Sequence, residues 1–267
     1  MGHREVFDRV KRATVAVVGL NVEGARHPFT IIGSGFCIDP AGIVVTCRHV
    51  VDEFMTIPTM EQIKQPTGGK TPGGGQILPL VQMLEMYAVF YWMLTQTRLV
   101  ALLARVTHVV CKTDVDLALL KLNPDQEAFP SGYPTLEIED PQEIHEGDEI
   151  GTCGFPLGTF LHDQLGTVTS SFTRGIISSI IPAPGAARDL IKGFQLDLGA
   201  THGNSGGPIF LLESGRVFGV LEAGFPAQSG LGHLTKAAPI YPVLEYGTID
   251  QLKRATLGEI PGELTGG

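Results

Sequence analysis

The protein has 267 residues, a length that fits one large β unit or two small packed barrels around a substantial core. Its 34 glycines, 18 prolines and 7% aromatic content favour many short strands joined by tight turns, and therefore an all-β fold over a helical bundle. A net charge of −9 argues against a broad phosphate-binding surface, so we expect no nucleic-acid partner.

The first part of the chain predicts a short helix followed by strands. A polar helix is expected at the N-terminus, then a buried strand over residues 14–20 and two strands within residues 30–51, turned at residues 39–42. The first 18 residues carry charges where a signal peptide has an apolar stretch. The sequence as written therefore predicts a cytoplasmic location and leaves an exported form open.

A long insertion is expected over residues 52–97, with a glycine-rich loop at residues 65–75. Polar and charged side chains interrupt the apolar stretch at residues 77–103, so it falls short of the roughly 20 apolar residues that cross a bilayer. We expect no membrane span. This stretch is expected to pack on a barrel as a strand hairpin or a helix, or to form an exposed apolar patch for oligomerisation or substrate capture.

The whole chain is expected to form one protease-sized unit with two β-rich halves. Residues 1–122 make up the N-terminal half and residues 123–145 a polar, proline-punctuated linker. Residues 146–267 make up the second half, in which residues 241–254 are expected to form one closing helix.

The segment GNSGGP at residues 203–208 carries the strongest chemical signal. Its glycines give Ser205 the backbone freedom to stand on a tight turn. On such a turn the N–H groups of Gly203 and Ser205 can converge on one point, as an oxyanion hole for the tetrahedral intermediate of acyl transfer. A glycine–serine turn alone is common, but the flanking strands strengthen the catalytic interpretation.

A serine hydroxyl needs a base, and an imidazole base needs an acid that fixes its tautomer. His49 lies near the end of an apolar strand expected over residues 43–51, where a core histidine would be costly. Asp116 comes directly before another apolar strand, and Asp114 lies close enough to take the same role. We expect His49 and Asp116 to be the base and the acid; a satisfied core histidine and a turn-capping aspartate are the structural alternatives.

These motifs resemble the trypsin-like serine proteases, and within them the HtrA (Deg) branch. The resemblance rests on GSGFCIDPAGIVVTCRHVV at residues 33–51, DVDLALLKL at residues 114–122 and QLDLGATHGNSGGPIF at residues 195–210, in the order His, Asp, Ser. It implies an all-β, chymotrypsin-like double barrel, with two six-stranded antiparallel β-barrels, short terminal helices and an active site between the barrels. No PDZ domain is expected after the protease unit.

The resemblance also implies roles for individual residues. His49 is the general base, Asp116 its orienting carboxylate and Ser205 the nucleophile. The oxyanion hole lies at Gly203, Asn204 and Ser205. Asn204 stands where digestive relatives have an aspartate that pairs with a newly cleaved N-terminus, so no such activating cleavage is expected.

The same resemblance places the walls of the substrate pocket on two segments. They are Leu198, Gly199, Ala200, Thr201 and His202 on the first, and Val220, Leu221, Glu222 and Ala223 on the second. Since no aspartate lies at the base of this pocket, a small or medium apolar P1 residue is favoured.

The sequence thus predicts a serine endopeptidase for protein or peptide substrates, including unfolded chains in protein quality control. By analogy with the family, the protein is expected to form a homotrimer. No cofactor and no catalytic metal are expected, because the eight histidines include no HExxH pair and the four cysteines have no CxxC spacing. A catalytically silent scaffold with this fold and an esterase with this triad are the alternative hypotheses.

Overall fold

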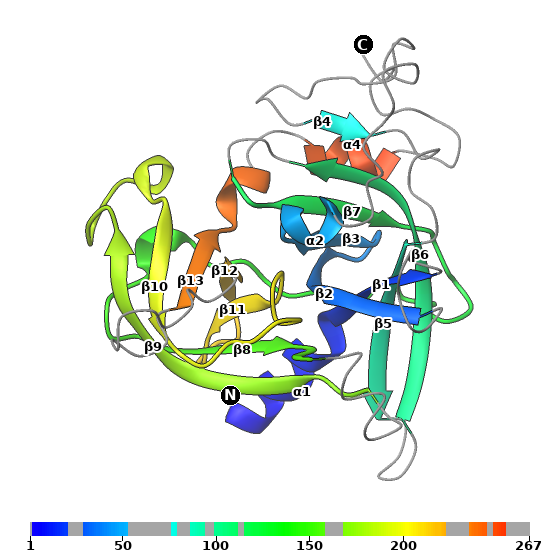
Figure 1. Ribbon diagram of the computed structural model, residues 1–267, viewed down its shortest axis with the longest axis horizontal. Helices are drawn as coiled ribbons and strands as arrows, with labels where there is room; N and C mark the ends of the chain where they lie inside the picture. The colour runs from blue at the N-terminus through cyan, green and yellow to red at the C-terminus, as the bar shows by residue number, and fades with distance from the viewer. Residues whose placement is uncertain are drawn as a thin grey trace.

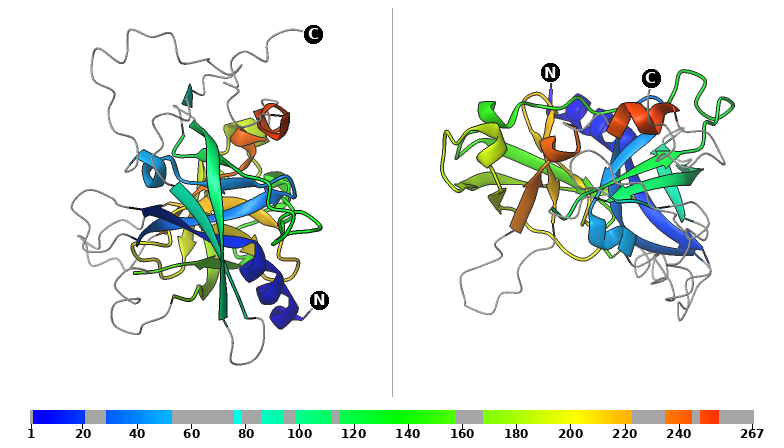
Figure 2. Two further views of the ribbon diagram at one scale, coloured as in Figure 1. Left: turned by 90° about the vertical axis from the view of Figure 1, so that its right-hand side faces the viewer. Right: turned by 90° about the horizontal axis from the view of Figure 1, so that it is seen from above.

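A computed structural model describes most of the chain as two antiparallel β-barrels (Figure 1). The described residues are 2–20, 29–52, 76–78, 86–93, 99–111, 115–157, 168–222, 235–244 and 248–254. Seen from above, the two barrels lie side by side (Figure 2, right), which confirms the predicted double-barrel fold.

The N-terminal barrel has the strand order β6-β5-β1-β2-β3-β7, and pairing between β6 and β7 closes it. A short seventh strand, β4, pairs with β6 as well. The bounds are β1 (Thr14–Leu20), β2 (Phe29–Asp39), β3 (Ile43–Thr46), β4 (Gln76–Leu78), β5 (Met86–Met93), β6 (Leu99–Cys111) and β7 (Ala118–Leu122). β1 and β3 are buried almost throughout, which explains why both segments are rich in valine and isoleucine.

The C-terminal barrel is closed by six strands in the order β10-β13-β12-β11-β8-β9. Their bounds are β8 (Glu149–Gly154), β9 (Ser171–Ile181), β10 (Gly193–Asp197), β11 (Pro208–Leu211), β12 (Val217–Leu221) and β13 (Thr235–Pro239). Ser205 lies in the connection from β10 to β11, next to the neighbouring barrel.

The helices lie mostly near the two ends of the chain. The N-terminal helix α1 (His3–Ala13) buries Val6, Val10 and Ala13, which share one face at helical spacing. The closing helix predicted over residues 241–254 is not one helix, because the chain forms the 3₁₀ turn η5 (Tyr241–Val243), a turn at Leu244 and then α4 (Thr248–Arg254). The other short helices are α2 (Arg48–Asp52), η3 (Pro141–Glu143) and η4 (Arg188–Leu190).

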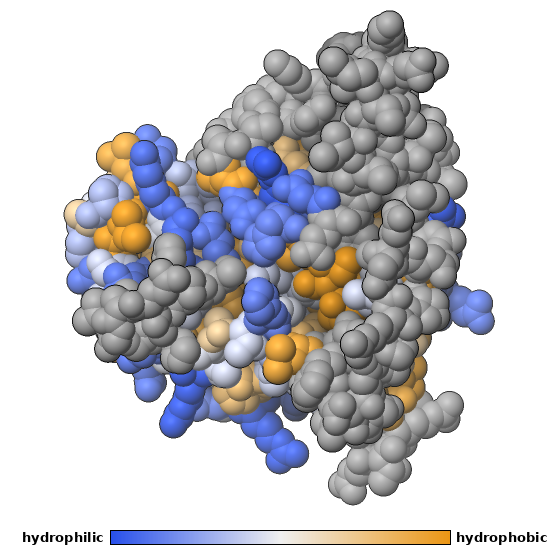
Figure 3. Space-filling model, viewed as in Figure 1, coloured by the Kyte–Doolittle hydropathy of each residue, from blue (hydrophilic) through white to orange (hydrophobic). Residues whose placement is uncertain are grey.

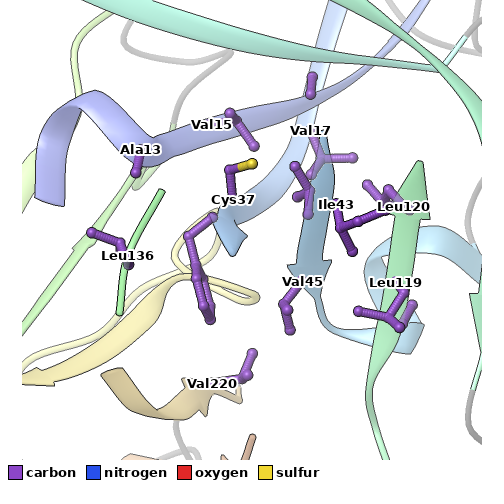
Figure 4. Close-up of a cluster of buried hydrophobic side chains, with 14 of the residues drawn as sticks. Ala13, Val15, Val17, Cys37, Ile43, Val45, Leu119, Leu120, Leu136 and Val220 are labelled. Atoms are coloured by element: carbon purple, nitrogen blue, oxygen red, sulfur yellow. The ribbon is translucent and has the colours of Figure 1, made fainter. Parts of the chain in front are cut away.

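One hydrophobic core runs from the N-terminal barrel into the C-terminal barrel. Val15, Ile43 and Leu120 lie on three strands of the first barrel, and Val220 of β12 belongs to the same cluster (Figure 4). All four cysteines are free and buried, as expected for reduced thiols. This shared core fixes the two barrels against each other.

The apolar stretch at residues 77–103 is a β-hairpin in its described part. β5 and β6 pair from Tyr87 opposite Arg105 to Met93 opposite Leu99, and β5 also pairs with β1. β5 therefore belongs to the barrel although it lies inside the expected insertion at residues 52–97. None of the helices in the described ranges is long and apolar enough to cross a membrane.

Candidate active site

His49 lies in the short helix α2 at the edge of the N-terminal barrel. The strand predicted over residues 43–51 is too long, because β3 ends at Thr46, where its pairing with β7 also ends. The chain then turns into α2, and Arg48 pairs with Asp52 across one helical turn at 3.2 Å. β-Branched residues stand on both sides of this point, so the residue pattern does not reveal where the strand ends and the helix begins.

The carboxylate of Asp116 holds His49 at two points. Oδ1 accepts the backbone N–H of His49 at 2.9 Å, and Oδ2 lies 2.5 Å from Nδ1 of the ring. Because a carboxylate only accepts, Nδ1 carries the proton and Nε2 is left as the basic nitrogen. Burial alone would raise the pKa of Asp116, but the hydrogen bonds from His49 outweigh it and lower that pKa below its usual value.

Asp116 is positioned by the turn that enters β7. The N–H of Leu117 donates to the carbonyl of Val115 at 2.9 Å, and the Leu117 side chain is fully buried. Arg48 N–H donates to the Asp116 carbonyl at 3.3 Å, which ties this turn to α2. The alternative carboxylate, Asp114, lies outside the described residues.

Ser205 stands on a turn that is bound to both barrels through its backbone. The Ser205 carbonyl accepts the N–H of Ser34 from β2 at 2.8 Å, and the next N–H, of Gly206, donates to Leu221 on β12 at 2.9 Å. Gly206 has a φ of +86°, and a Cβ there would overlap the Ser34 carbonyl oxygen and Thr46 Oγ1. Only glycine can bring this turn so close to the first barrel.

The peptide between His202 and Gly203 is turned so that its carbonyl faces Leu157, whose N–H it accepts at 2.8 Å. In a trans peptide the N–H points the opposite way, so the Gly203 N–H points away from Leu157. Gly203 has a φ of +93°, which glycine adopts readily. Within the described part of the chain, neither Gly203 N–H nor Ser205 N–H donates to a backbone carbonyl, and both remain available to an oxyanion.

Ser34 is a site residue for which the sequence predicted no role. Its hydroxyl donates to the Gly203 carbonyl at 2.6 Å and accepts the N–H of Phe155 at 2.9 Å. One side chain from β2 therefore supports the peptide between Gly203 and Asn204, which lies between the two predicted oxyanion donors. The GSGF segment contained this serine, but its contacts depend on residues more than 120 positions away.

The residues expected to form the substrate pocket divide into buried and exposed ones. The side chains of Leu198, Val220 and Leu221 are buried in the hydrophobic cores, so only their backbone can face a substrate. The exposed or partly exposed ones are Gly199, Ala200, Thr201, His202 and Glu222. Ala223 lies outside the described residues.

A cavity of about 540 Å³, lined by both charged and apolar side chains, opens beside Asp116. Its wall includes Asp189 and Lys192, and also Glu222, which pairs with Lys236 at 2.7 Å. The Glu222 side chain is 14% exposed and the Lys236 side chain 37%, so the carboxylate is the more buried partner of this ion pair. On the face shown in Figure 3, hydrophilic residues gather where Figure 1 places α2, the helix that carries His49.

Residues 33–220 match the family model of the trypsin-like peptidase domain. The chain belongs to the trypsin-like peptidase family. This membership covers the segments that carry His49, Asp116 and Ser205, and it confirms the family that the sequence motifs predicted.

The chain is also similar to individual HtrA-type proteases. It is 30% identical over 262 residues to a Rickettsia prowazekii protein named "Probable periplasmic serine endoprotease DegP-like", covering 93% of this chain and 40% of the relative. It is 25% identical over 227 residues to the mitochondrial serine protease HTRA2 of Bos taurus, covering 80% and 37%. The chain thus spans less than half the length of these relatives.

Two solved structures share the fold. The crystal structure of Deg5 aligns with a TM-score of 0.55 at 20% identity and covers 90% of both chains. The HtrA-type protease AlgW, solved with a decapeptide, aligns with a TM-score of 0.58 at 16% identity and covers 94% of this chain and 67% of AlgW.

Proposed function

We propose that the protein is a serine endopeptidase, in which His49 is the general base, Asp116 its orienting carboxylate and Ser205 the nucleophile. The observation that carries the proposal is the pair of hydrogen bonds from the His49 backbone N–H and ring to the Asp116 carboxylate, in a chain of the trypsin-like peptidase family. A capping aspartate would satisfy the backbone N–H alone, whereas the contact at Nδ1 also fixes the tautomer that a base requires.

In the proposed reaction His49 Nε2 takes the proton of the Ser205 hydroxyl as Ser205 Oγ bonds to the carbonyl carbon of a peptide bond. Asp116 stays ionised and stabilises the imidazolium that forms. The negative oxygen of the tetrahedral intermediate accepts hydrogen bonds from the N–H groups of Gly203 and Ser205. The imidazolium then protonates the leaving amine, and water hydrolyses the acyl-enzyme by the same steps in reverse.

The proposed substrates are polypeptides in an extended or unfolded state. The site lies in a crevice between two barrels, and an extended segment presents its peptide bond to such a crevice more readily than a folded surface does. Residues 198–202 and the backbone of residues 220–222 form the proposed substrate walls. A homotrimer and an exported location are further proposals, and they are drawn only from the family and from relatives that are named as periplasmic.

A digestion of unfolded casein tests the proposal. Wild-type protein is expected to release peptides at a rate that Ser205→Ala reduces to background. The same EDTA-containing buffer is used in every assay. A short peptide ester is assayed in parallel. Ester turnover without peptide cleavage would support the esterase alternative, and turnover of neither substrate by folded wild type would support the scaffold.

A further inference from the structure

Cys47 is a buried nucleophile beside the triad that the proposed mechanism does not use. Its side chain is fully buried just before α2, and its thiol donates to the Leu221 carbonyl at 3.2 Å. The Cys47 sulfur, a ring nitrogen of His49 and a carboxylate oxygen of Asp116 all lie within 4.8 Å of one another. Among the described residues, this is the group whose donor atoms are close enough to hold a metal ion.

The three donors combine a soft sulfur ligand, a nitrogen ligand and a hard oxygen ligand for a metal ion. Thiolate, imidazole and carboxylate together are typical zinc ligands, whereas magnesium and calcium prefer oxygen alone. Zinc binds sulfur at about 2.3 Å and nitrogen or oxygen at about 2.0–2.2 Å, so tetrahedral ligand atoms lie about 3.4 Å apart.

The donors need only small shifts to reach that arrangement. The 2.5 Å contact between His49 and Asp116 must widen by about 1 Å, and the sulfur, which lies within 4.8 Å of both, must approach by at most about 1.4 Å. Rotation of the three side chains is sufficient for shifts of this size. An ion can reach the group because the His49 and Asp116 side chains are 43% and 32% exposed, and Asp116 also lines the neighbouring cavity.

The charges around the group also favour a cation. Burial raises the pKa of the Cys47 thiol, and the negative charges of Asp116 and Glu222 raise it further. The nearby cations have partners of their own, since Arg48 pairs with Asp52 and Lys236 pairs with Glu222. A divalent ion would therefore enter a region in which two carboxylates already act on the sulfur.

We propose that Cys47, His49 and Asp116 bind a zinc-class divalent cation, and that this binding reversibly switches the protease off. The ion displaces the Cys47 thiol proton to solvent and leaves the imidazole neutral. If it binds Nε2, it occupies the lone pair that accepts the Ser205 proton. If it binds Nδ1, the remaining ring proton moves to Nε2, and the base is lost in that case also. The inhibition rests on the proposed function, but the binding does not.

Cobalt(II) is the probe for the binding, because a cobalt–thiolate bond gives a charge-transfer absorption in the near ultraviolet. Reduced, metal-free wild-type protein is expected to show this band with one Co²⁺ per chain, and Zn²⁺ is expected to abolish it by displacement. Cys47→Ser and Cys47→Ala should both lose the band. Cys153→Ser, which removes a buried thiol in the other barrel, should keep it. Circular dichroism and the melting temperature establish that each variant is folded.

Zinc inhibition is measured as the ratio of casein cleavage with EDTA to cleavage with added Zn²⁺, so that each variant is its own reference. Replacing the thiolate with a hydroxyl is expected to weaken zinc inhibition by at least about tenfold, and Cys153→Ser should leave it unchanged. Absence of the cobalt band in wild type, or an undiminished band in the folded Cys47 variants, would overturn the proposal. A thiolate band in a protein without protease activity would leave the metal site standing and remove only the proposed function.

Discussion

The two walls of the crevice hold their reactive groups in different ways. On the N-terminal barrel a side chain positions the reactive group, because the Asp116 carboxylate accepts hydrogen bonds from both the ring and the backbone N–H of His49. On the C-terminal barrel the backbone positions the reactive group, because the Ser205 turn is hydrogen-bonded through the Ser205 carbonyl and the Gly206 N–H. The base can thus be disabled without harming the fold, whereas the nucleophile turn cannot be changed without disturbing how the barrels meet.

The largest effect is expected when the reacting groups themselves are removed. His49→Ala and Ser205→Ala should each lower kcat by about 10⁵- to 10⁶-fold, and the double variant should be scarcely worse than either single one, because the two groups act as one unit. Steady-state kinetics on one peptide substrate measures all three variants. If the losses in activation free energy of the two single variants simply added in the double variant, His49 and Ser205 would act independently, which would contradict this account.

Asp116→Asn should lower kcat by about 10⁴-fold while the fold is retained, because an amide can donate to Nδ1 and so favour the wrong tautomer. Asp39→Asn is the matched control. Asp39 is also a paired carboxylate of the N-terminal barrel, bonded to Lys253 at 2.5 Å away from the triad, and its loss should leave kcat unchanged. Equal losses in the two variants would show that Asp116 acts only by supporting the barrel.

Gly206→Ala tests the backbone wall and should destabilise the protein by about 2–4 kcal/mol, from a left-handed φ and a clash with Ser34 and Thr46. Gly147→Ala is the control, since Gly147 has a similar φ of +91° but open space around its Cβ position. It should cost about 1–2 kcal/mol. Chemical denaturation measures both, and equal costs would contradict the tight approach of the two barrels at Gly206.

The smallest effect concerns acid stability. The pKa of Asp116 is lowered in the folded protein, so its stabilising contribution is complete above the usual value of 3.8 and is lost as the pH falls through the lowered pKa. The difference in unfolding free energy between wild type and Asp116→Asn should therefore shrink as the pH falls from about 5 to about 2. Urea denaturation across that range measures it, and a difference that grows toward low pH would refute this sign.

The resemblance to the trypsin-like proteases predicted the double barrel, and the local motifs around His49 and Asp116 predicted that these two side chains meet. The sequence did not predict that His49 lies in α2, because the valines at residues 44, 45, 50 and 51 fit one long strand as well as a strand followed by a helix. It also gave no role to Ser34 and did not predict that Glu222 pairs with Lys236. Their positions depend on contacts between segments that are far apart in the chain, and no local spacing reports such contacts.

The central claim is that His49, oriented by Asp116, activates Ser205. A fluorophosphonate probe with intact-mass and peptide analysis tests it most directly, because only an activated serine forms the stable adduct. The account predicts one adduct on Ser205 of wild type, none in Ser205→Ala, and labelling that is strongly slowed in His49→Ala and Asp116→Asn. Labelling of Ser205 at an undiminished rate in His49→Ala, or no adduct in folded wild type, would contradict it.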